Sequence, residues 1–210
     1  MSWEISNKGL LVPDGMPTVC WDLDSTLRSS VQRRYLLPEV RAGRKTWDDY
    51  SMLAAKDTPI AGSVAMLRML SIEADIFNVA VTGASEATRG LTEAWCDEYD
   101  VPLDDFMMRP AGDETENGVW KVSCIRKLQA AGMDVQLFVE DWEPIARYIA
   151  QETEIPVLGV NPFDPDAMTI TVDNLEEVLT RRNSAEGYFG GVATARDIFA
   201  ELRKRRETGV

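Results

Sequence analysis

The sequence predicts an α/β fold in which a mostly parallel sheet carries helices on both faces. Short apolar runs alternate with amphipathic segments along the chain. The apolar runs are nearly unbroken, as they are in strands buried on both faces. Strand and helix patterns follow one another in succession, which favours a parallel sheet. The length of 210 residues fits one domain with a small insertion.

Five apolar segments are expected to form the strands, and five amphipathic segments the helices. The expected strands are 18–21, 75–81, 106–108, 136–139 and 156–160. The expected helices are 63–71, 86–99, 119–131, 144–151 and 192–206. Ser85 and Asn117 are the predicted N-caps of the second and third helices, and Pro144 is expected at the first position of the fourth.

One long mixed segment interrupts this rhythm after the first strand. Residues 27–61 contain Pro38, Gly43 and Pro59, and we interpret them as an insertion packed over the edge of the sheet. The predicted organisation is therefore a core of residues 1–26 and 62–210, which ends in a helical extension, plus this insertion.

Composition excludes several classes of function. The chain has no histidine, which rules out a Ser-His-Asp triad and His-ligated zinc. Cys20, Cys96 and Cys124 form no CxxC pair, so we expect reduced thiols in a cytosolic protein. The net charge of −13 disfavours non-specific coating of nucleic acid or anionic membrane. No apolar run is long enough to span a membrane, and residues 1–11 do not read as a signal peptide.

Acidic and hydroxyl side chains follow three of the predicted strands. Asp22 and Asp24 follow the first, Thr82 the second, and Glu140 with Asp141 a later one. Ligands of parallel α/β sheets bind beyond the carboxyl ends of strands. Carboxylates gathered there repel one another, and a hard cation such as Mg²⁺ relieves the repulsion. The alternative is that each pair only forms a turn or caps a helix.

Lys121 is a further candidate. With Asn117 as N-cap it would lie in the first helical turn, where a cation opposes the helix dipole. A lysine that opposes the dipole breaks a local rule of helix stability, and a residue that breaks such a rule with no visible compensating contact points to a functional site. The alternative is a solvated lysine of little consequence.

The order of these groups resembles the haloacid dehalogenase (HAD) superfamily of phosphotransferases. Its four motifs match Asp22-Leu23-Asp24-Ser25-Thr26, Thr82, Lys121 and Glu140-Asp141, over roughly residues 18 to 160. The resemblance implies a Rossmann-like core with a small helical cap, residues 27–61, after the first strand.

The resemblance also implies roles for these residues. Asp22 would attack phosphorus to form an aspartyl-phosphate. Asp24, kept protonated by its negative neighbours, would protonate the leaving oxygen and then deprotonate the hydrolytic water. Thr82 and Gly83 would hold phosphoryl oxygens, and Lys121 would neutralise their charge. The metal, Mg²⁺, would be held by Asp22, the Asp24 main-chain carbonyl and Asp141, with Glu140 as a supporting or water-mediated contact.

Two features bear on the substrate. The small predicted cap leaves an open site, which suits bulky substrates such as polynucleotide ends. A locally basic stretch with nearby aromatic residues is typical of a surface that follows a nucleic-acid backbone, although a solvated face or internal salt bridges are an equal alternative. The candidate polynucleotide contacts are Arg28, Arg33, Arg34, Arg41, Arg44 and Lys45.

The segment before Lys121 sharpens the resemblance. Arg109, followed by Gly112-Asp113, is similar to the phosphatase domain of phage-type polynucleotide kinase-phosphatases, which implies that Arg109 contacts substrate phosphate. The chain has no G-x-x-x-x-G-K-[ST] loop, so no kinase half is expected.

The leading hypothesis is a Mg²⁺-dependent phosphatase that acts on 3′-phosphate ends of DNA or RNA or on nucleotides. We expect this phosphatase to act in the cytoplasm, and a phage protein that acts in the cytoplasm of its host also fits this expectation. The second hypothesis is a small-molecule phosphatase for a nucleoside monophosphate or sugar phosphate. The third is a non-catalytic binding module on the same fold.

Overall fold

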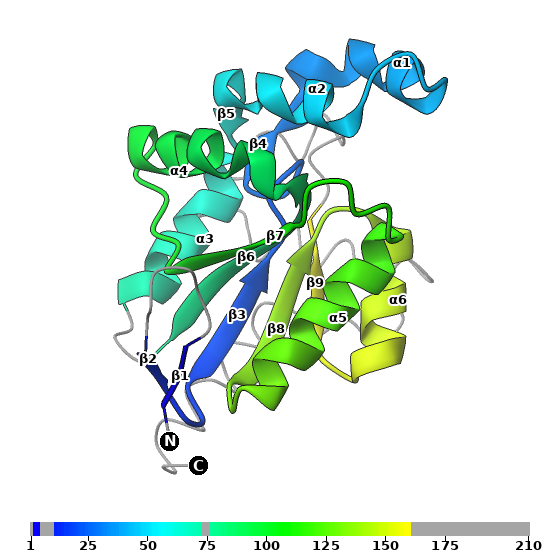
Figure 1. The fold of residues 1–210 in the computed structure, drawn as a ribbon. Coiled ribbons are helices and arrows are strands. Elements are labelled where there is room, and N and C mark those ends of the chain that lie inside the picture. The colour runs from blue at the N-terminus through cyan, green and yellow to red at the C-terminus, as the bar shows by residue number, and fades with distance from the viewer. Residues whose placement is uncertain (1, 5–10, 73–75, 161–210) are drawn as a thin grey trace, which may run out of the picture.

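The computed structural model describes residues 2–4, 11–72 and 76–160, and its core is a five-stranded sheet. The strand order is β7-β6-β3-β8-β9, and every pairing within it is parallel (Figure 1). The bounds are Pro17–Trp21 for β3, Phe77–Ser85 for β6, Asp105–Arg109 for β7, Asp134–Glu140 for β8 and Val157–Gly159 for β9. The predicted fold class is confirmed.

The register of the central strands sets the position of the site. Trp21, the last residue of β3, pairs with Ala80 of β6 on one side and with Val139 of β8 on the other. The residues that follow Trp21 and Val139 therefore leave the sheet at the same edge. The strand β6 runs on past Val81, where the predicted strand ends, and stops only at Ser85.

Two apolar clusters cover the two faces of the sheet. Along β3, Val19 and Trp21 belong to one cluster, and Cys20 between them belongs to the other. The first cluster packs against α3 (Ala61–Ile72) and α4 (Arg89–Glu98), and the second against α5 (Asn117–Ala130) and α6 (Glu143–Thr153). Each fully buried large aliphatic side chain contributes about 1.5–3 kcal/mol to this packing.

The start of α5 differs from the prediction. Its N-cap is Glu116, whose carboxylate accepts a hydrogen bond from the Val119 amide, and Asn117 is the first helical residue. Lys121 is consequently the fifth residue of the helix, beyond its first turn. The predicted conflict between Lys121 and the helix dipole is wrong, because the dipole acts mainly on the terminal turn.

The predicted N-cap Ser85 does accept a hydrogen bond from Ala87, at the 3-10 turn that precedes α4.

The inserted segment leaves and returns to the core side by side. Its strands β4 (Arg28–Ser29) and β5 (Thr58–Pro59) pair antiparallel, and the Ile60 amide donates to the Leu27 carbonyl at 2.8 Å. Between them lie the 3-10 helix Ser30–Leu36, α1 (Leu37–Arg41), α2 (Trp47–Ser51) and a second 3-10 helix, Met52–Lys56.

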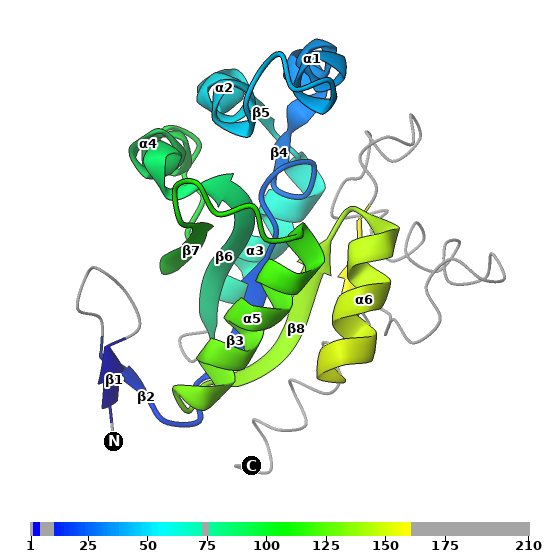
Figure 2. The same ribbon diagram turned by 45° about the vertical axis from the view of Figure 1, so that its right-hand side comes forward.

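This segment lies beyond the carboxyl ends of the strands, above α4 and the end of β3 (Figures 1 and 2). The insertion therefore packs over the carboxyl edge of the sheet. The reason is that β4 follows β3 after only a short turn and continues away from the sheet (Figure 2). The insertion is thus placed over the residues that end the central strands.

Two further parts of the chain complete the description. A separate antiparallel pair is formed by β1 (Ser2–Glu4) and β2 (Leu11–Pro13). The predicted helix 192–206 and the rest of the C-terminal extension lie outside the described residues. Within the residues that are described, the structure has no helix of the length and apolar content that crossing a membrane requires.

Candidate active site

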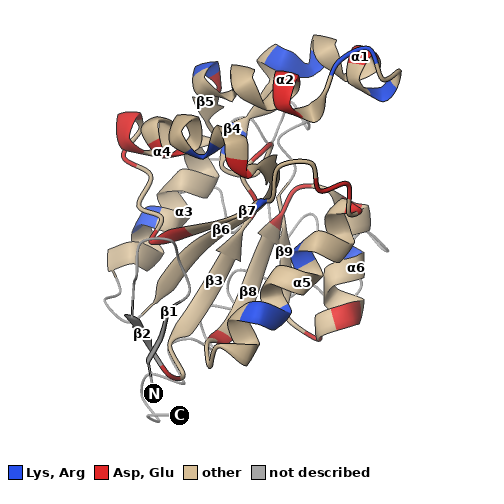
Figure 3. Ribbon diagram, in the orientation of Figure 1, with Lys and Arg blue, Asp and Glu red and all other residues tan. Residues whose placement is uncertain are grey.

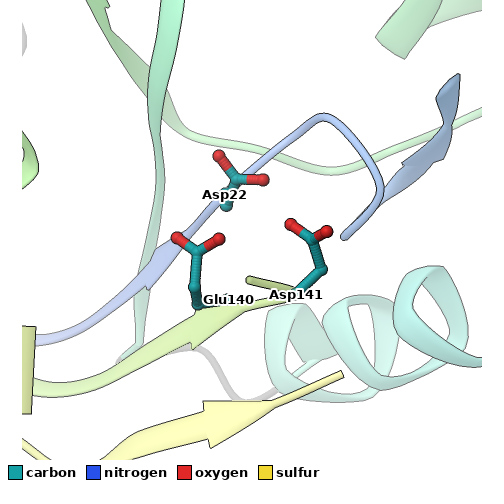
Figure 4. Close-up of side chains that lie close together, drawn as sticks. All are labelled: Asp22, Glu140 and Asp141. Atoms are coloured by element: carbon teal, nitrogen blue, oxygen red, sulfur yellow. The ribbon is translucent and has the colours of Figure 1, made fainter. Parts of the chain in front are cut away.

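Three carboxylates from two adjacent strands converge at the carboxyl edge of the sheet. Asp22 directly follows β3, Glu140 ends β8, and Asp141 follows it. One oxygen from each lies within 4.8 Å of the others, and Figure 4 shows the three side chains turned toward a common space. Asp22 and Glu140 are buried, whereas Asp141 is partly exposed. The strand-end carboxylates therefore do meet, as the parallel topology predicts.

Lys121 enters this cluster from α5. Its side chain is 1% exposed, and Nζ donates to Asp22 Oδ1 at 2.7 Å and to Glu140 Oε2 at 2.6 Å. Burial alone would lower the pKa of Lys121, but the two carboxylates raise it above its ordinary value. The ammonium is therefore permanent at neutral pH, and it links the ends of β3 and β8.

One ammonium leaves the three carboxylates with excess negative charge. Burial is the main cause that raises the pKa of Asp22 to about 7, with Lys121 acting against the shift and Glu140 adding to it. Burial, with the charges of Asp22 and Glu140, raises the pKa of Asp141 to about 9. A divalent cation would relieve this repulsion, and oxygen ligands suit Mg²⁺. The residues present thus fit a hard metal ion.

The neighbours of the carboxylates divide the predicted metal ligands into two groups. Both oxygens of Glu140 already have donors, since Oε2 accepts from Lys121 and Oε1 accepts from the Trp142 amide at 3.1 Å. Thr26 Oγ1 lies 3.1 Å from Asp22 Oδ2 and 3.4 Å from Asp141 Oδ1. Because a carboxylate oxygen accepts more than one bond, Asp22 and Asp141 keep acceptor capacity for a metal, whereas Glu140 holds Lys121 in place.

A tight turn after β3 brings Thr26 back to the cluster. The amides of Thr26, Leu27 and Arg28 all converge on the Leu23 carbonyl, and Ser25 adopts a left-handed φ of 69°. A non-glycine residue in that conformation costs roughly 1–2 kcal/mol. Hydrogen bonding of Ser25 Oγ to Ser30 Oγ at 2.6 Å accompanies the strained turn.

Asp24 does not join the acidic cluster. Its Oδ1 accepts from Arg28 Nε and from Arg33 Nη2, both at 2.6 Å. Burial would raise the pKa of Asp24, but the two guanidinium groups hold it well below its usual range. The expectation that negative neighbours keep Asp24 protonated is therefore wrong, because its nearest charged partners are cations.

Comparisons with known proteins agree with this architecture. No family model and no curated protein matches the sequence. Among solved structures, a chain of the Pnkp1/Rnl/Hen1 RNA repair complex matches at 20% identity with a TM-score of 0.57, over 69% of this chain and 42% of that chain. A phosphonoacetaldehyde hydrolase-like protein from Oleispira antarctica matches at 10% identity with a TM-score of 0.51, over 93% and 95% of the two chains.

The chain has the haloacid dehalogenase fold. Because the match covers less than half of the RNA repair chain, it concerns one part of that protein. A haloacid dehalogenase-like hydrolase from Streptococcus pneumoniae is also found, at 13% identity over 69% of this chain and 84% of that chain, with a TM-score of 0.48. The resemblance predicted from the four motifs is confirmed for the fold, on the two matches with TM-scores of 0.57 and 0.51.

In this haloacid dehalogenase fold, the predicted basic surface splits into two parts. Arg28 and Arg33 are each 1% exposed and pair with Asp24, and Arg33 also pairs with Asp57 at 2.8 Å. The prediction that these two arginines contact a polynucleotide is therefore corrected, because they are buried in ion pairs. Arg34 is partly buried. The remaining members of the predicted set are exposed around the end of α1: Arg41, Arg44 and Lys45 (Figure 3).

The predicted phosphate-binding residues lie on β6 and β7. The Thr82 carbonyl accepts from Trp120 Nε1 at 3.0 Å, which ties β6 to the start of α5. Arg109 Nη2 donates to Asn117 Oδ1 at 3.1 Å, and its Nε is buried with no hydrogen-bond partner among the described residues. A Cβ on Gly83 would lie 2.5 Å from Asn117 Oδ1 and 3.3 Å from Arg109 Nη2, so Arg109 lies beside Gly83.

Several residues of this region have roles that the sequence did not predict. Asp57 and Tyr50 surround Arg33, whose guanidinium lies 4.3 Å from the Tyr50 ring centroid. Asn117 holds Arg109, and Thr26 joins Asp22 to Asp141. The sequence pointed to Thr26 as the last residue of the first motif, to Asn117 as an N-cap and to Tyr50 as an aromatic residue near the basic stretch. Asp57 carried no local signal, because its contact with Arg33 joins segments 24 residues apart.

Proposed function

We propose that this protein is a Mg²⁺-dependent phosphomonoester hydrolase that uses Asp22 as its nucleophile. The observation that carries the proposal is the position of Lys121, buried between Asp22 and Glu140, with Asp141 beside them. A permanent cation against a buried carboxylate is suited to stabilising the charge that develops on a phosphoryl group in transfer. The fold supports the proposal, because the first motif follows β3, the last lies at the end of β8, Thr82 lies in the last part of β6, and Lys121 reaches the same cluster from α5.

The proposed chemistry begins with attack of an Asp22 oxygen on phosphorus. Lys121 holds Asp22 through Oδ1 and thereby orients the carboxylate for the attack. The P–O bond to the leaving group breaks as the new bond forms, and a water later hydrolyses the aspartyl-phosphate to release inorganic phosphate. Thr82 and Gly83 hold phosphoryl oxygens in this proposal. When bound by Asp22, the Asp24 carbonyl and Asp141, Mg²⁺ would supply Lewis-acid stabilisation of the phosphoryl charge.

Asp24 is proposed to transfer the proton in both steps. Arg28 and Arg33 favour its ionised form, which is the form needed to take a proton from the hydrolytic water. Protonation of the leaving oxygen requires that Asp24 first gain a proton, so the contact with the two arginines must loosen when substrate binds. We also propose that residues 27–61 act as a small cap over this site.

For the substrate, we propose 3′-phosphorylated nucleic-acid ends or nucleotides. Exposed Arg41, Arg44 and Lys45 on the cap support this choice, as does the likeness in fold to a chain of an RNA repair complex. Pairing of Arg28 and Arg33 with aspartates favours the second candidate, a phosphatase of small molecules, because it removes two cations from the surface. The cytoplasmic location stays a prediction.

The test compares phosphate release, with Mg²⁺, from a 3′-phosphorylated oligonucleotide, a nucleoside monophosphate and a sugar phosphate. Higher kcat/KM on the oligonucleotide supports the first candidate, and higher kcat/KM on the sugar phosphate supports the second. Triple substitution of Arg41, Arg44 and Lys45 by alanine should weaken only the oligonucleotide reaction and reduce its dependence on salt. No release from any ester, including an aryl phosphate, would favour a non-catalytic binding module.

A further inference from the structure

Trp142 lies where the acidic cluster meets solvent. It directly follows Asp141, and its amide donates to Glu140 Oε1 at 3.1 Å. Asp22 and Glu140 are buried, whereas Asp141 is partly exposed, so the cluster opens on the side of Asp141. The Trp142 side chain is 55% exposed. A large aromatic surface therefore stands at the opening, on a backbone that is fixed to the cluster.

The cap carries a cation whose charge interacts with the same cluster. Arg34 belongs to the 3-10 helix Ser30–Leu36 and is partly buried. Burial lowers the pKa of Arg34, and the charges of Tyr50 and Asp141 act against that shift. Tyr35, the next residue, is 68% exposed. The core thus offers an exposed aromatic ring beside the cluster, and the cap adds a cation that interacts with Asp141.

These groups match the chemistry of one class of leaving group. A phosphate held at Asp22 would direct the rest of its ester away from the buried carboxylates and toward solvent. A nucleoside presents a flat base that stacks on an exposed indole, and such stacking contributes about 1–3 kcal/mol per base. A glycerol unit has no ring that could stack on the indole.

We propose that Trp142 is a specificity-determining residue that stacks on the base of a nucleotide whose 3′-phosphate occupies the acidic cluster. This inference rests on the proposed function and deepens it, because it selects nucleotides over other phosphomonoesters. The stacking adds binding energy to the substrate and leaves the reacting atoms untouched.

Kinetics on two esters test the inference. Trp142→Ala should raise KM for a nucleoside 3′-monophosphate about tenfold or more, with kcat within about twofold of wild type. The same variant should leave KM for glycerol 2-phosphate, which has no ring, unchanged. Trp142→Phe should restore most of the nucleotide affinity. An unchanged nucleotide KM, or an equal rise in KM on both esters, would overturn the inference.

A fluorescence titration separates this inference from the proposed function. Addition of the nucleoside 3′-monophosphate should quench wild-type tryptophan emission, and Trp142→Phe should abolish the quenching. Trp47→Phe is the matched control, because Trp47 is 58% exposed on α2, and it should retain the quenching. Quenching that persists in Trp142→Phe, or no quenching in wild type, would contradict stacking. If neither ester is hydrolysed, the proposed function fails while the titration still decides on the stacking.

Discussion

Arg33 Nη2 donates to Asp24 Oδ1 at 2.6 Å. This contact joins the cap to Asp24, which lies two residues after Asp22 in the turn that follows β3. The same guanidinium donates through Nε to Asp57 Oδ2 at 2.8 Å, near the end of the cap. Arg33 thus ties the start of the cap, its end and the core turn into one buried ion-pair network.

This network predicts that Arg33→Ala destabilises the protein. Asp57 is 1% exposed on its side chain and its Oδ1 has no hydrogen-bond partner among the described residues, so loss of Arg33 leaves a buried carboxylate unpaired. Breaking a buried pair in this way costs about 3–5 kcal/mol. Urea unfolding should report a free energy of unfolding lower by about 3 kcal/mol.

Arg44→Ala is the matched control for that measurement. Arg44 pairs with Glu39 on the exposed surface of the cap, and exposed pairs contribute little to stability. The free energy of unfolding should stay near that of wild type. Equal stability of the Arg33 and Arg44 variants would show that the buried network does not hold the cap.

Lys121→Met is expected to remove turnover. The substitution keeps the length of the side chain and deletes the ammonium that contacts Asp22 and Glu140. Loss of one group that stabilises developing charge lowers kcat by about 10²–10³. Lys127→Met, on an exposed part of the same helix, should leave kcat unchanged. Steady-state phosphate release measures kcat for both variants. A kcat of the Lys121 variant within threefold of the wild-type kcat would contradict the role assigned to Lys121.

The placement of these residues was predictable to different degrees. Asp22 and Asp141 could be brought together from sequence, because adjacent parallel strands end at one edge. Lys121 was singled out for a wrong reason: the helix begins earlier than expected, and its importance comes from burial between two carboxylates. The partners of Asp24 could not be assigned from the sequence. Arg28 and Arg33 could have faced solvent or formed internal ion pairs, and which of the two occurs depends on how the cap folds back onto the core.

Magnesium should stabilise the folded protein through Asp22 and Asp141. A ligand that binds only the folded state raises stability by RT ln(1 + [L]/Kd), about 2.7 kcal/mol at a concentration one hundred times Kd. Differential scanning fluorimetry should show a higher Tm with Mg²⁺ for wild type and for Asp97→Asn, an exposed control on α4. Asp141→Asn should lose the shift. A shift that survives in Asp141→Asn would exclude Asp141 as a ligand.

The thiols are expected to be unreactive in the native protein. Cys20, Cys96 and Cys124 are all buried, and none of them forms a disulfide. Burial raises the pKa of Cys20 well above its ordinary value and raises the pKa of Cys124 to about 12. A raised pKa keeps these two thiols protonated at pH 8 and at pH 9, and the protonated thiol is the poor nucleophile.

Alkylation with iodoacetamide, followed by mass spectrometry, measures this reactivity. The native protein should gain no label on Cys20 or Cys124 at either pH, whereas the urea-unfolded protein should be labelled at both. Because the folded pKa values lie above the unfolded ones, the stability that these thiols contribute should fall as pH rises beyond about 8.5. Rapid native labelling at pH 8 would show that the sheet core opens readily.

The central claim is that Asp22, set against Lys121 and beside Asp141, is a phosphate-transferring nucleophile. The most direct measurement is phosphate release from a 3′-phosphorylated oligonucleotide and an aryl phosphate, with Mg²⁺ and with EDTA, by wild type and by Asp22→Asn. We predict Mg²⁺-dependent release by wild type and none by Asp22→Asn, whose unfolding transition should match that of wild type. Release by a folded Asp22→Asn near the wild-type rate would contradict the account.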